Sequence, residues 1–89
     1  MLAEGTFDGR VAVVTGGGSG LGRALAVELA RLGADVAVAG RRPEPLAETV
    51  RLVEEHGGRG LAQPTDVRDP AAVDALVEAT VSELGRVDV

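Results

Sequence analysis

The 89-residue sequence contains no cysteine and a single histidine, His56. Without cysteine the chain has neither disulfides nor a thiolate metal site, and one histidine excludes a metal site built on several imidazoles. We interpret His56 as a cation at a helix end or a solvated side chain, because it lies in the last turn of a predicted helix and Gly57 follows it. We therefore expect no metal site.

Lysine is also absent, so positive charge comes only from nine arginines, against 14 acidic residues and a net charge of −5. These charges are spread along the chain, whereas nucleic-acid binding needs a basic face. The first five residues lack the basic and apolar blocks of a signal peptide, and no apolar run approaches membrane-spanning length. We expect a cytoplasmic protein that partners neither nucleic acid nor a membrane.

The sequence does contain an alternation of β-branched apolar runs and amphipathic helical patterns, within a length that fits one domain, residues 1–89. The predicted strands cover residues 11–14, 35–39 and 60–65, the helices cover 20–32, 43–56 and 70–84, and a fourth strand begins at 86–89. Such units predict an α/β fold, the first half of a Rossmann-type doubly wound parallel sheet. The expected strand order is 3-2-1-4, with the first two helices on one face and the third on the other.

Helical spacing also predicts which side chains face the sheet. In the first helix we expect an apolar face made by four leucines at near-helical spacing: Leu21, Leu25, Leu29 and Leu32. In the third helix we expect a stripe of six residues: Val73, Leu76, Val77, Thr80, Val81 and Leu84. Asp69 should cap this helix, with Pro70 at its first position.

A glycine cluster joins the first strand to the first helix. Residues 11–14 are four apolar residues without polar alternation, as in a strand buried on both faces, and residues 16–22 contain five glycines. The helix that follows presents unpaired N–H groups and the positive end of its dipole to whatever lies over the turn. Phosphate is the natural ligand of such a turn.

The spacing of these glycines identifies the type of turn. No register satisfies Gly-x-Gly-x-x-Gly, and the absence of lysine excludes a phosphate loop ending in Gly-Lys-Ser/Thr. The pattern is Thr15-Gly16-x-x-x-Gly20-x-Gly22 after a buried strand, and it resembles the short-chain dehydrogenase/reductase family. The close flanking by a β-branched run and a helical pattern disfavours the alternative of a flexible Gly/Ser linker.

This resemblance implies an NAD(P)-binding domain and a set of cofactor contacts. The residues implied for the pyrophosphate and adjacent ribose are Gly16, Ser19, Gly20, Leu21 and Gly22. Asp66 and Val67 follow the third predicted strand, and the resemblance implies that they contact the adenine amine and ring. Because ligands bind beyond the carboxyl ends of strands, Asp66 would share a rim with the glycine turn. Taken alone, Asp66 is equally explained as the cap of a turn.

The residues at the end of the second predicted strand indicate which cofactor is preferred, NAD(H) or NADP(H). Dinucleotide folds that bind NAD carry an acidic residue there, about twenty residues past the glycine turn, but this chain has Gly40. Arg41 and Arg42 follow, and a guanidinium fork matches the geometry and charge of a phosphate. We expect NADP(H) to be preferred, with NAD(H) also possible. Alternatively, these arginines are solvated or pair with the nearby acidic residues Glu44 or Glu48.

The family transfers a hydride between the nicotinamide and a carbonyl or alcohol carbon, using Ser, Tyr and Lys with a supporting Asn. This chain has no tyrosine, lysine or asparagine, so we expect it to be inactive alone and assign it no catalytic residue. The alternative is a non-catalytic nucleotide-binding or interaction module. In the family that this chain resembles, the strand that begins at residue 86 continues into an Asn-Asn-Ala-Gly motif. We also expect a homo-oligomer, because an incomplete fourth strand leaves an apolar edge.

Overall fold

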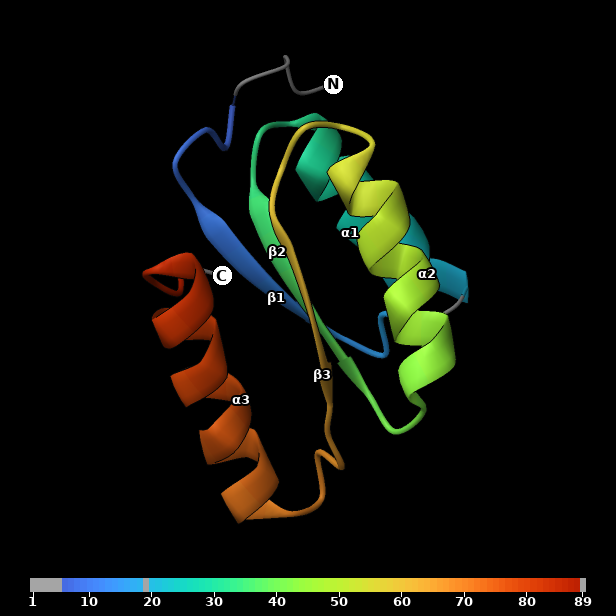
Figure 1. The fold of residues 1–89 in the computed structure, drawn as a ribbon, viewed down its shortest axis with the longest axis vertical. Helices are drawn as coiled ribbons and strands as arrows, with labels where there is room; N and C mark the ends of the chain where they lie inside the picture. The colour runs from blue at the N-terminus through green and yellow to red at the C-terminus, as the bar shows by residue number, and fades with distance from the viewer. Residues whose placement is uncertain (1–5, 19, 89) are drawn as a thin grey trace.

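The computed structural model describes residues 6–18 and 20–88, in which strands and helices alternate as predicted (Figure 1). The elements are β1 (Val11–Thr15), α1 (Gly20–Arg31), β2 (Asp35–Gly40), α2 (Pro43–Glu54), β3 (Gly60–Pro64) and α3 (Pro70–Leu84). Their ends differ from the predicted ones by no more than two residues. Within the described ranges no helix is both long and apolar enough to cross a bilayer.

The three strands form a parallel sheet in the order β1-β2-β3. Val11 lies opposite Asp35, and Val36 lies opposite Gly60. Figure 1 shows α1 and α2 on one side of this sheet and α3 on the other. The α/β class, the order of the first three strands and the distribution of the helices are therefore confirmed.

The predicted start of a fourth strand is wrong for residues 86–88, and Val89 lies outside the described residues. Instead, Asp88 is joined to the first residue of β1. The Asp88 N–H donates to the Val11 carbonyl oxygen at 2.8 Å, and the Val11 N–H donates to Asp88 Oδ2 at 2.9 Å. Because one residue pair does not extend into a ladder, β1 is an edge strand in the described part of the chain. Self-association through this edge remains a prediction.

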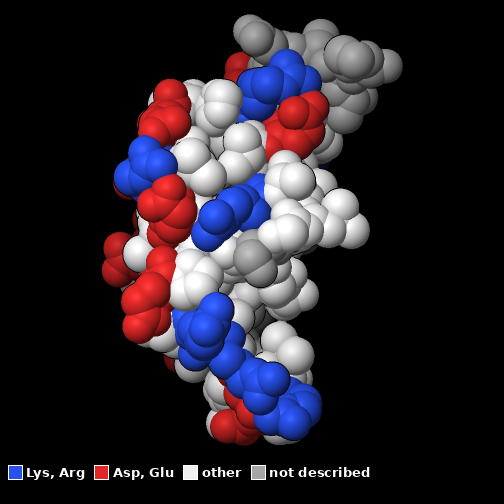
Figure 2. All heavy atoms as spheres, turned by 90° about the vertical axis from the view of Figure 1, so that its right-hand side faces the viewer, with Lys and Arg blue, Asp and Glu red and all other residues white. Residues whose placement is uncertain are grey.

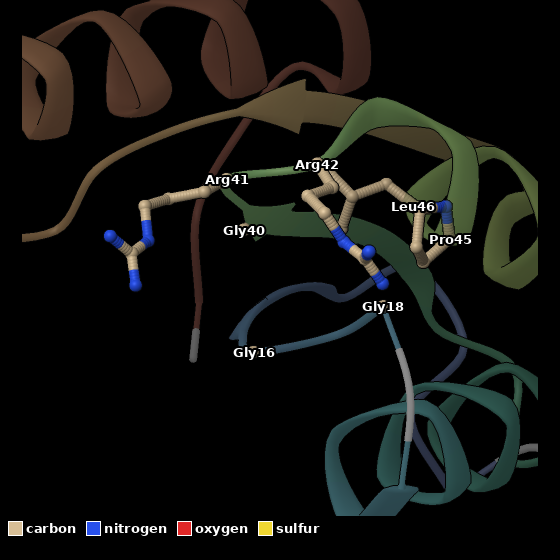
Figure 3. Close-up of a pocket in the computed structure, with 7 residues that line it drawn as sticks. All are labelled: Gly16, Gly18, Gly40, Arg41, Arg42, Pro45 and Leu46. Carbon is tan, nitrogen blue, oxygen red and sulfur yellow. The ribbon is translucent and has the colours of Figure 1, made fainter.

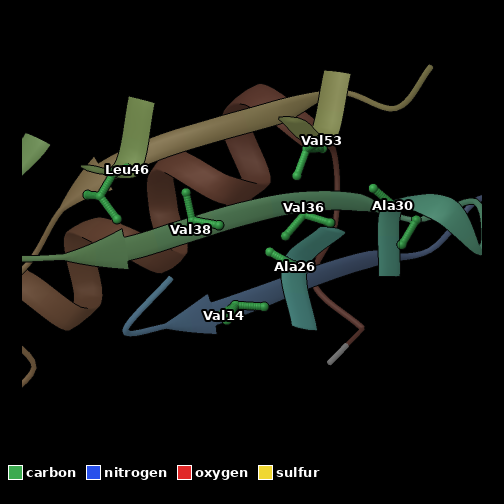
Figure 4. Close-up of a cluster of buried hydrophobic side chains, with 8 residues drawn as sticks. Val14, Ala26, Ala30, Val36, Val38, Leu46 and Val53 are labelled. Carbon is green, nitrogen blue, oxygen red and sulfur yellow. The ribbon is translucent and has the colours of Figure 1, made fainter. Parts of the chain in front are cut away.

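The main core lies between the sheet and the α1/α2 layer (Figure 4). Its strand side is made of valines, since a strand buried on both faces favours β-branched residues. Its helix side combines small residues of α1 with larger ones of α2. The buried members are Val14, Ala26, Ala30, Ala34, Val36, Val38, Leu46 and Val53.

The expected leucine face of α1 is wrong at its first two positions, because Leu21 is 86% exposed and Leu25 is 49% exposed. Ala26 and Ala30 are buried instead. The glycine turn brings the start of α1 so close to β1 that only small side chains fit on the inner side. The helical period of the apolar residues is therefore as predicted, but the buried row lies one residue further along the chain than Leu25 and Leu29.

The stripe of α3 is similarly narrower than predicted. Leu76, Thr80 and Leu84 are buried, whereas Val77 and Val81 are nearly half exposed. Alone on its side of the three-stranded sheet, α3 buries one row of side chains at helical spacing. The adjacent row remains in solvent.

Asp69 caps α3 as predicted: its carboxylate accepts a hydrogen bond from the Ala71 N–H at 3.0 Å. We expect Asp69→Ala to lower the free energy of unfolding by about 1 kcal/mol, since an otherwise unpaired helix N–H loses its acceptor. Urea unfolding followed by circular dichroism measures this loss. Asp74→Ala, at an exposed position in the same helix, is the control and should change stability by less than about 0.5 kcal/mol. Equal losses in the two variants would contradict the capping role.

Candidate functional site

The turn between β1 and α1 is a tight connection that requires glycine at defined positions. Gly16 and Gly20 have φ values of +69° and +57°, a backbone region that residues with a side chain rarely adopt. A Cβ atom on Gly22 would overlap the Gly16 carbonyl group, lying 2.6 Å from its carbon. The turn therefore brings the N-terminus of α1, with its unpaired N–H groups, directly against the end of β1. Ser19, predicted to belong to this turn, lies outside the described residues.

Two adjoining pockets lie over the carboxyl ends of the strands, and we call them together the crevice. The first, of about 500 Å³, is lined by the glycine turn and the start of α2: Gly16, Gly18, Gly40, Arg41, Arg42, Pro45 and Leu46 (Figure 3). The second, of about 420 Å³, continues toward the end of β3: Thr15, Gly16, Gly40, Arg41, Thr65, Asp66, Val67 and Arg68. Because both pockets share Gly16, Gly40 and Arg41, the crevice runs across all three strand ends.

The structure thus brings together predicted site residues from three separate segments of the chain. Gly16, Arg41, Arg42, Asp66 and Val67 all line the crevice. The remaining described ones form the first turn of α1: Gly20, Leu21 and Gly22. The side chain of Leu21 points into solvent and not into the core.

Arg41 and Arg42 are exposed and extend in different directions. In Figure 3 the Arg42 guanidinium reaches over Gly18, beside Pro45, whereas Arg41 extends the other way. Within residues 6–18 and 20–88, no ion pair joins either arginine to Glu44 or Glu48, and Glu48 pairs with Arg51 instead. In Figure 2, a group of basic side chains lies at the lower end of the face that is shown. The expected alternative of arginines neutralised by these acids is therefore not what the structure shows.

Asp66 caps the turn that follows β3. Its Oδ1 accepts from the Arg68 backbone N–H at 3.0 Å, and its two oxygens accept from the Arg68 guanidinium, each at 3.1 Å. The hydrogen bond from the Arg68 side chain lowers the pKa of Asp66, with smaller contributions from the Arg68 N–H and the charge of Arg41. The carboxylate is thus held ionised at the rim of the crevice, next to the exposed Val67.

We expect Arg68→Met to raise the pKa of Asp66 toward its ordinary value, because the main group that stabilises the carboxylate is removed. Since the folded-state pKa is lowered, the contact stabilises the fold above the ordinary pKa and is lost as the pH falls through the lowered one. A carbon-detected NMR titration of the carboxyl group measures the midpoint. Arg51→Met, which removes an arginine bound to Glu48 and Glu55, should leave it unchanged. An unchanged midpoint in Arg68→Met would contradict this account.

Two residues of the site were not found from the sequence. Arg23 in α1 and Thr49 in α2 bind each other and the carbonyl groups of the glycine turn. Thr49 lies three residues after Leu46 and four before Val53, so its place on the buried face of α2 was a readable signal. No such pattern in the sequence distinguishes Arg23 from the other eight arginines.

Comparison with known proteins shows a similarity to short chain dehydrogenases over nearly the whole chain. The family model for short chain dehydrogenases matches residues 10–89. An uncharacterised oxidoreductase of Caenorhabditis elegans, F53C11.3, is 44% identical over an alignment of 86 residues, and the alignment covers 94% of this chain and 27% of that protein.

Two solved structures are similar in both sequence and fold. L-sorbose reductase from Gluconobacter frateurii, complexed with NADPH and L-sorbose, is 38% identical with a TM-score of 0.89, covering 97% of this chain and 33% of that one. Carveol dehydrogenase from Mycobacterium avium, in complex with NAD, is 36% identical with a TM-score of 0.89. The matched residues cover 94% of this chain and 35% of the carveol dehydrogenase. The chain therefore spans between about a quarter and a third of the length of these relatives.

These similarities agree with the geometry of the crevice, since the glycine turn and the strand ends that line it lie within the matched residues. The relatives are oxidoreductases, and those with a bound cofactor hold NADPH or NAD. The alternative of a non-catalytic nucleotide-binding or interaction module is not favoured. The chain belongs to the short-chain dehydrogenase family, of which it matches the N-terminal, Rossmann-type portion.

Proposed function

We propose that this chain is the NADP(H)-binding portion of an oxidoreductase that transfers a hydride between the nicotinamide and a carbonyl or alcohol substrate. The observation that carries the preference for NADP(H) is the end of β2. Gly40 offers no carboxylate to a ribose 2′-hydroxyl, and no salt bridge between described residues engages Arg41 or Arg42, which line the pocket beside it. Two guanidinium groups outside any salt bridge favour a ligand that carries a 2′-phosphate.

The glycine turn fits a pyrophosphate. Because Gly22 has no Cβ, the start of α1 packs against the Gly16 carbonyl, and the first N–H groups of the helix lie at the crevice. In this proposal the backbone groups of Gly16, Gly20, Leu21 and Gly22 hold the pyrophosphate and the adjacent ribose. Ser19 completes this set.

Asp66 and Val67 are assigned to the adenine. The carboxylate of Asp66 accepts hydrogen bonds, as an exocyclic amine requires, and the exposed Val67 offers an apolar contact to the ring. Arg68 occupies both carboxylate oxygens, so an adenine amine shares them with this arginine or displaces it.

A bound nicotinamide supplies or accepts the hydride, and the residues of this chain bind and orient the dinucleotide. With no tyrosine, lysine or asparagine, the chain lacks the side chains that the family uses for proton transfer. We infer that residues 1–89 bind cofactor as part of a single NAD(P)-binding domain and do not catalyse turnover by themselves.

Separate titrations of the 89-residue chain with NADPH and NADH, followed by nicotinamide fluorescence, test this function. We expect the dissociation constant for NADPH to be about a hundredfold lower than that for NADH, because each of the two arginines offers a charge-assisted hydrogen bond to the 2′-phosphate. Circular dichroism on the same sample confirms that the chain is folded. Failure of the folded chain to bind either cofactor would contradict the proposed function, and tighter binding of NADH would contradict the proposed preference.

A further inference from the structure

A polar clamp made of Arg23 and Thr49 holds the glycine turn against α2. Arg23 Nη2 donates to the Gly18 carbonyl oxygen at 2.6 Å and to the Pro45 carbonyl oxygen at 3.0 Å. Gly18 and Pro45 both line the first pocket of the crevice, and the Arg42 guanidinium lies beside them in Figure 3. A single nitrogen atom therefore bridges two segments that form the walls of this pocket.

Thr49 fixes the orientation of this arginine. Its side chain is fully buried, its hydroxyl donates to the Gly17 carbonyl oxygen at 2.6 Å, and its oxygen accepts from Arg23 Nε at 2.9 Å. The hydroxyl also lies 3.2 Å from the Pro45 carbonyl oxygen, so its proton has an acceptor in both the glycine turn and α2. The clamp is thus a connected network and not an isolated surface contact.

The clamp also changes the electrostatics of the pocket. Carbonyl oxygens carry partial negative charge and repel a phosphate, but those of Gly17, Gly18 and Pro45 are all engaged by the clamp. In the part of the chain that the structure describes, no carboxylate lies within 4 Å of the Arg23 guanidinium. Its positive charge, which also acts on Glu48, adds to that of Arg42 beside the first pocket.

The walls that the clamp joins are already in tight contact. A Cβ atom on Gly18 would lie 3.0 Å from the Pro45 Cβ, and one on Gly17 would lie 2.8 Å from the Val38 Cβ. Arg42 is the N-cap residue of α2, three residues before Pro45. Because Arg23 binds the Pro45 carbonyl group, it also fixes the backbone at the start of α2, from which the Arg42 side chain extends over the pocket.

We infer that Arg23 and Thr49 are positioning residues that set the selectivity of the crevice for a 2′-phosphate. They fix the spacing between the glycine turn and the first turn of α2. This inference rests on the proposed function, because it assigns the first pocket to the 2′-phosphate of the cofactor. Neither residue touches the phosphate in this assignment, and both act through the placement of Arg42 and of the turn.

The test compares two probes that differ only in the 2′-phosphate, adenosine 2′,5′-bisphosphate and adenosine 5′-monophosphate, by isothermal titration calorimetry on the 89-residue chain. The readout is the ratio of their dissociation constants. We expect Thr49→Val, which removes the hydroxyl without changing charge, to lower the selectivity by about tenfold, and Thr49→Ser to restore it. Arg23→Lys keeps the charge but loses the fork, and should lower the selectivity as well. Arg51→Met, an exposed arginine of α2 outside the clamp, is the matched control.

The outcomes separate this inference from the proposed function. Wild-type protein that binds both probes equally contradicts the inference and the proposed preference for NADP(H). Wild-type selectivity that persists in Thr49→Val overturns the inference and leaves the proposed function standing. If Thr49→Val does not fold, the Arg23→Lys variant tests the inference. Wild-type selectivity in Arg23→Lys would overturn it, because the positive charge would then be sufficient without the hydrogen bonds of the clamp. A lowered thermal midpoint with unchanged selectivity also overturns the inference, since it assigns the clamp a structural role only.

Discussion

Replacing Gly22 with alanine is expected to lower the free energy of unfolding by about 1–3 kcal/mol, the usual cost of overpacking. The added methyl group would overlap the carbonyl group of Gly16, and a backbone atom cannot turn aside as a side chain can. Alanine favours a helix over glycine by about 1 kcal/mol, but this gain is smaller than the cost of moving the turn. Urea unfolding followed by circular dichroism measures the net change.

The same substitution should weaken NADPH binding by about tenfold or more, because N–H groups that hold a pyrophosphate lose their alignment when the turn shifts. Ala24→Ser is the control, since it enlarges an exposed side chain in the same helix and should leave both stability and binding nearly unchanged. Normal NADPH affinity in Gly22→Ala would contradict the assignment of the turn to the pyrophosphate.

Removing both arginines that follow β2 is expected to abolish the preference for NADPH over NADH. Each guanidinium offers charge-assisted hydrogen bonds worth about 1.5–3 kcal/mol, so Arg41→Met and Arg42→Met should each weaken NADPH binding by about tenfold. Together they should weaken it by about a hundredfold, while the affinity for NADH stays the same. Fluorescence titration of the single and double variants with both cofactors measures these changes.

Arg31→Met serves as the control for lost positive charge, because Arg31 is bound to Glu28 on the exposed side of α1. It should leave the ratio of the two affinities unchanged. A parallel loss of NADPH and NADH affinity in the double variant would mean that the arginines act on a group common to both cofactors. That result would contradict the assignment to the 2′-phosphate.

Much of the fold could be predicted because local signals agreed with one another. The run at residues 11–14, the glycine cluster after it and the helical pattern beyond it place β1 and α1 without reference to the rest of the chain. Gly33 and Gly85 follow the C-terminal ends of α1 and α3 with φ values of +106° and +94°, the left-handed conformation in which helices commonly end. Parallel strand–helix units then fix the topology, and the topology brings the strand ends to one rim.

The features that could not be predicted from the sequence depend on contacts between distant segments of the chain. Which row of α1 faces inward is set by how closely the glycine turn pulls the helix to the sheet, so Leu21 could not be placed from its spacing alone. Arg23 binds Thr49, 26 residues further along the chain, and no local pattern encodes that distance. The pairing of Asp66 with Arg68 is local, yet Asp66 taken alone is explained equally by capping a turn and by binding a ligand, and only its position and the family resemblance favour the ligand.

The most direct test of the central claim, that the crevice over the strand ends binds NADP(H), is an amide NMR titration of the chain with NADPH. The account predicts that the largest shift changes fall on Gly16, Gly20, Gly22, Arg42 and Asp66, with small changes along α3. With NADH, the changes at Arg42 should shrink while those in the glycine turn persist. Shift changes concentrated on α3, or none in the glycine turn at saturating NADPH, would contradict the claim.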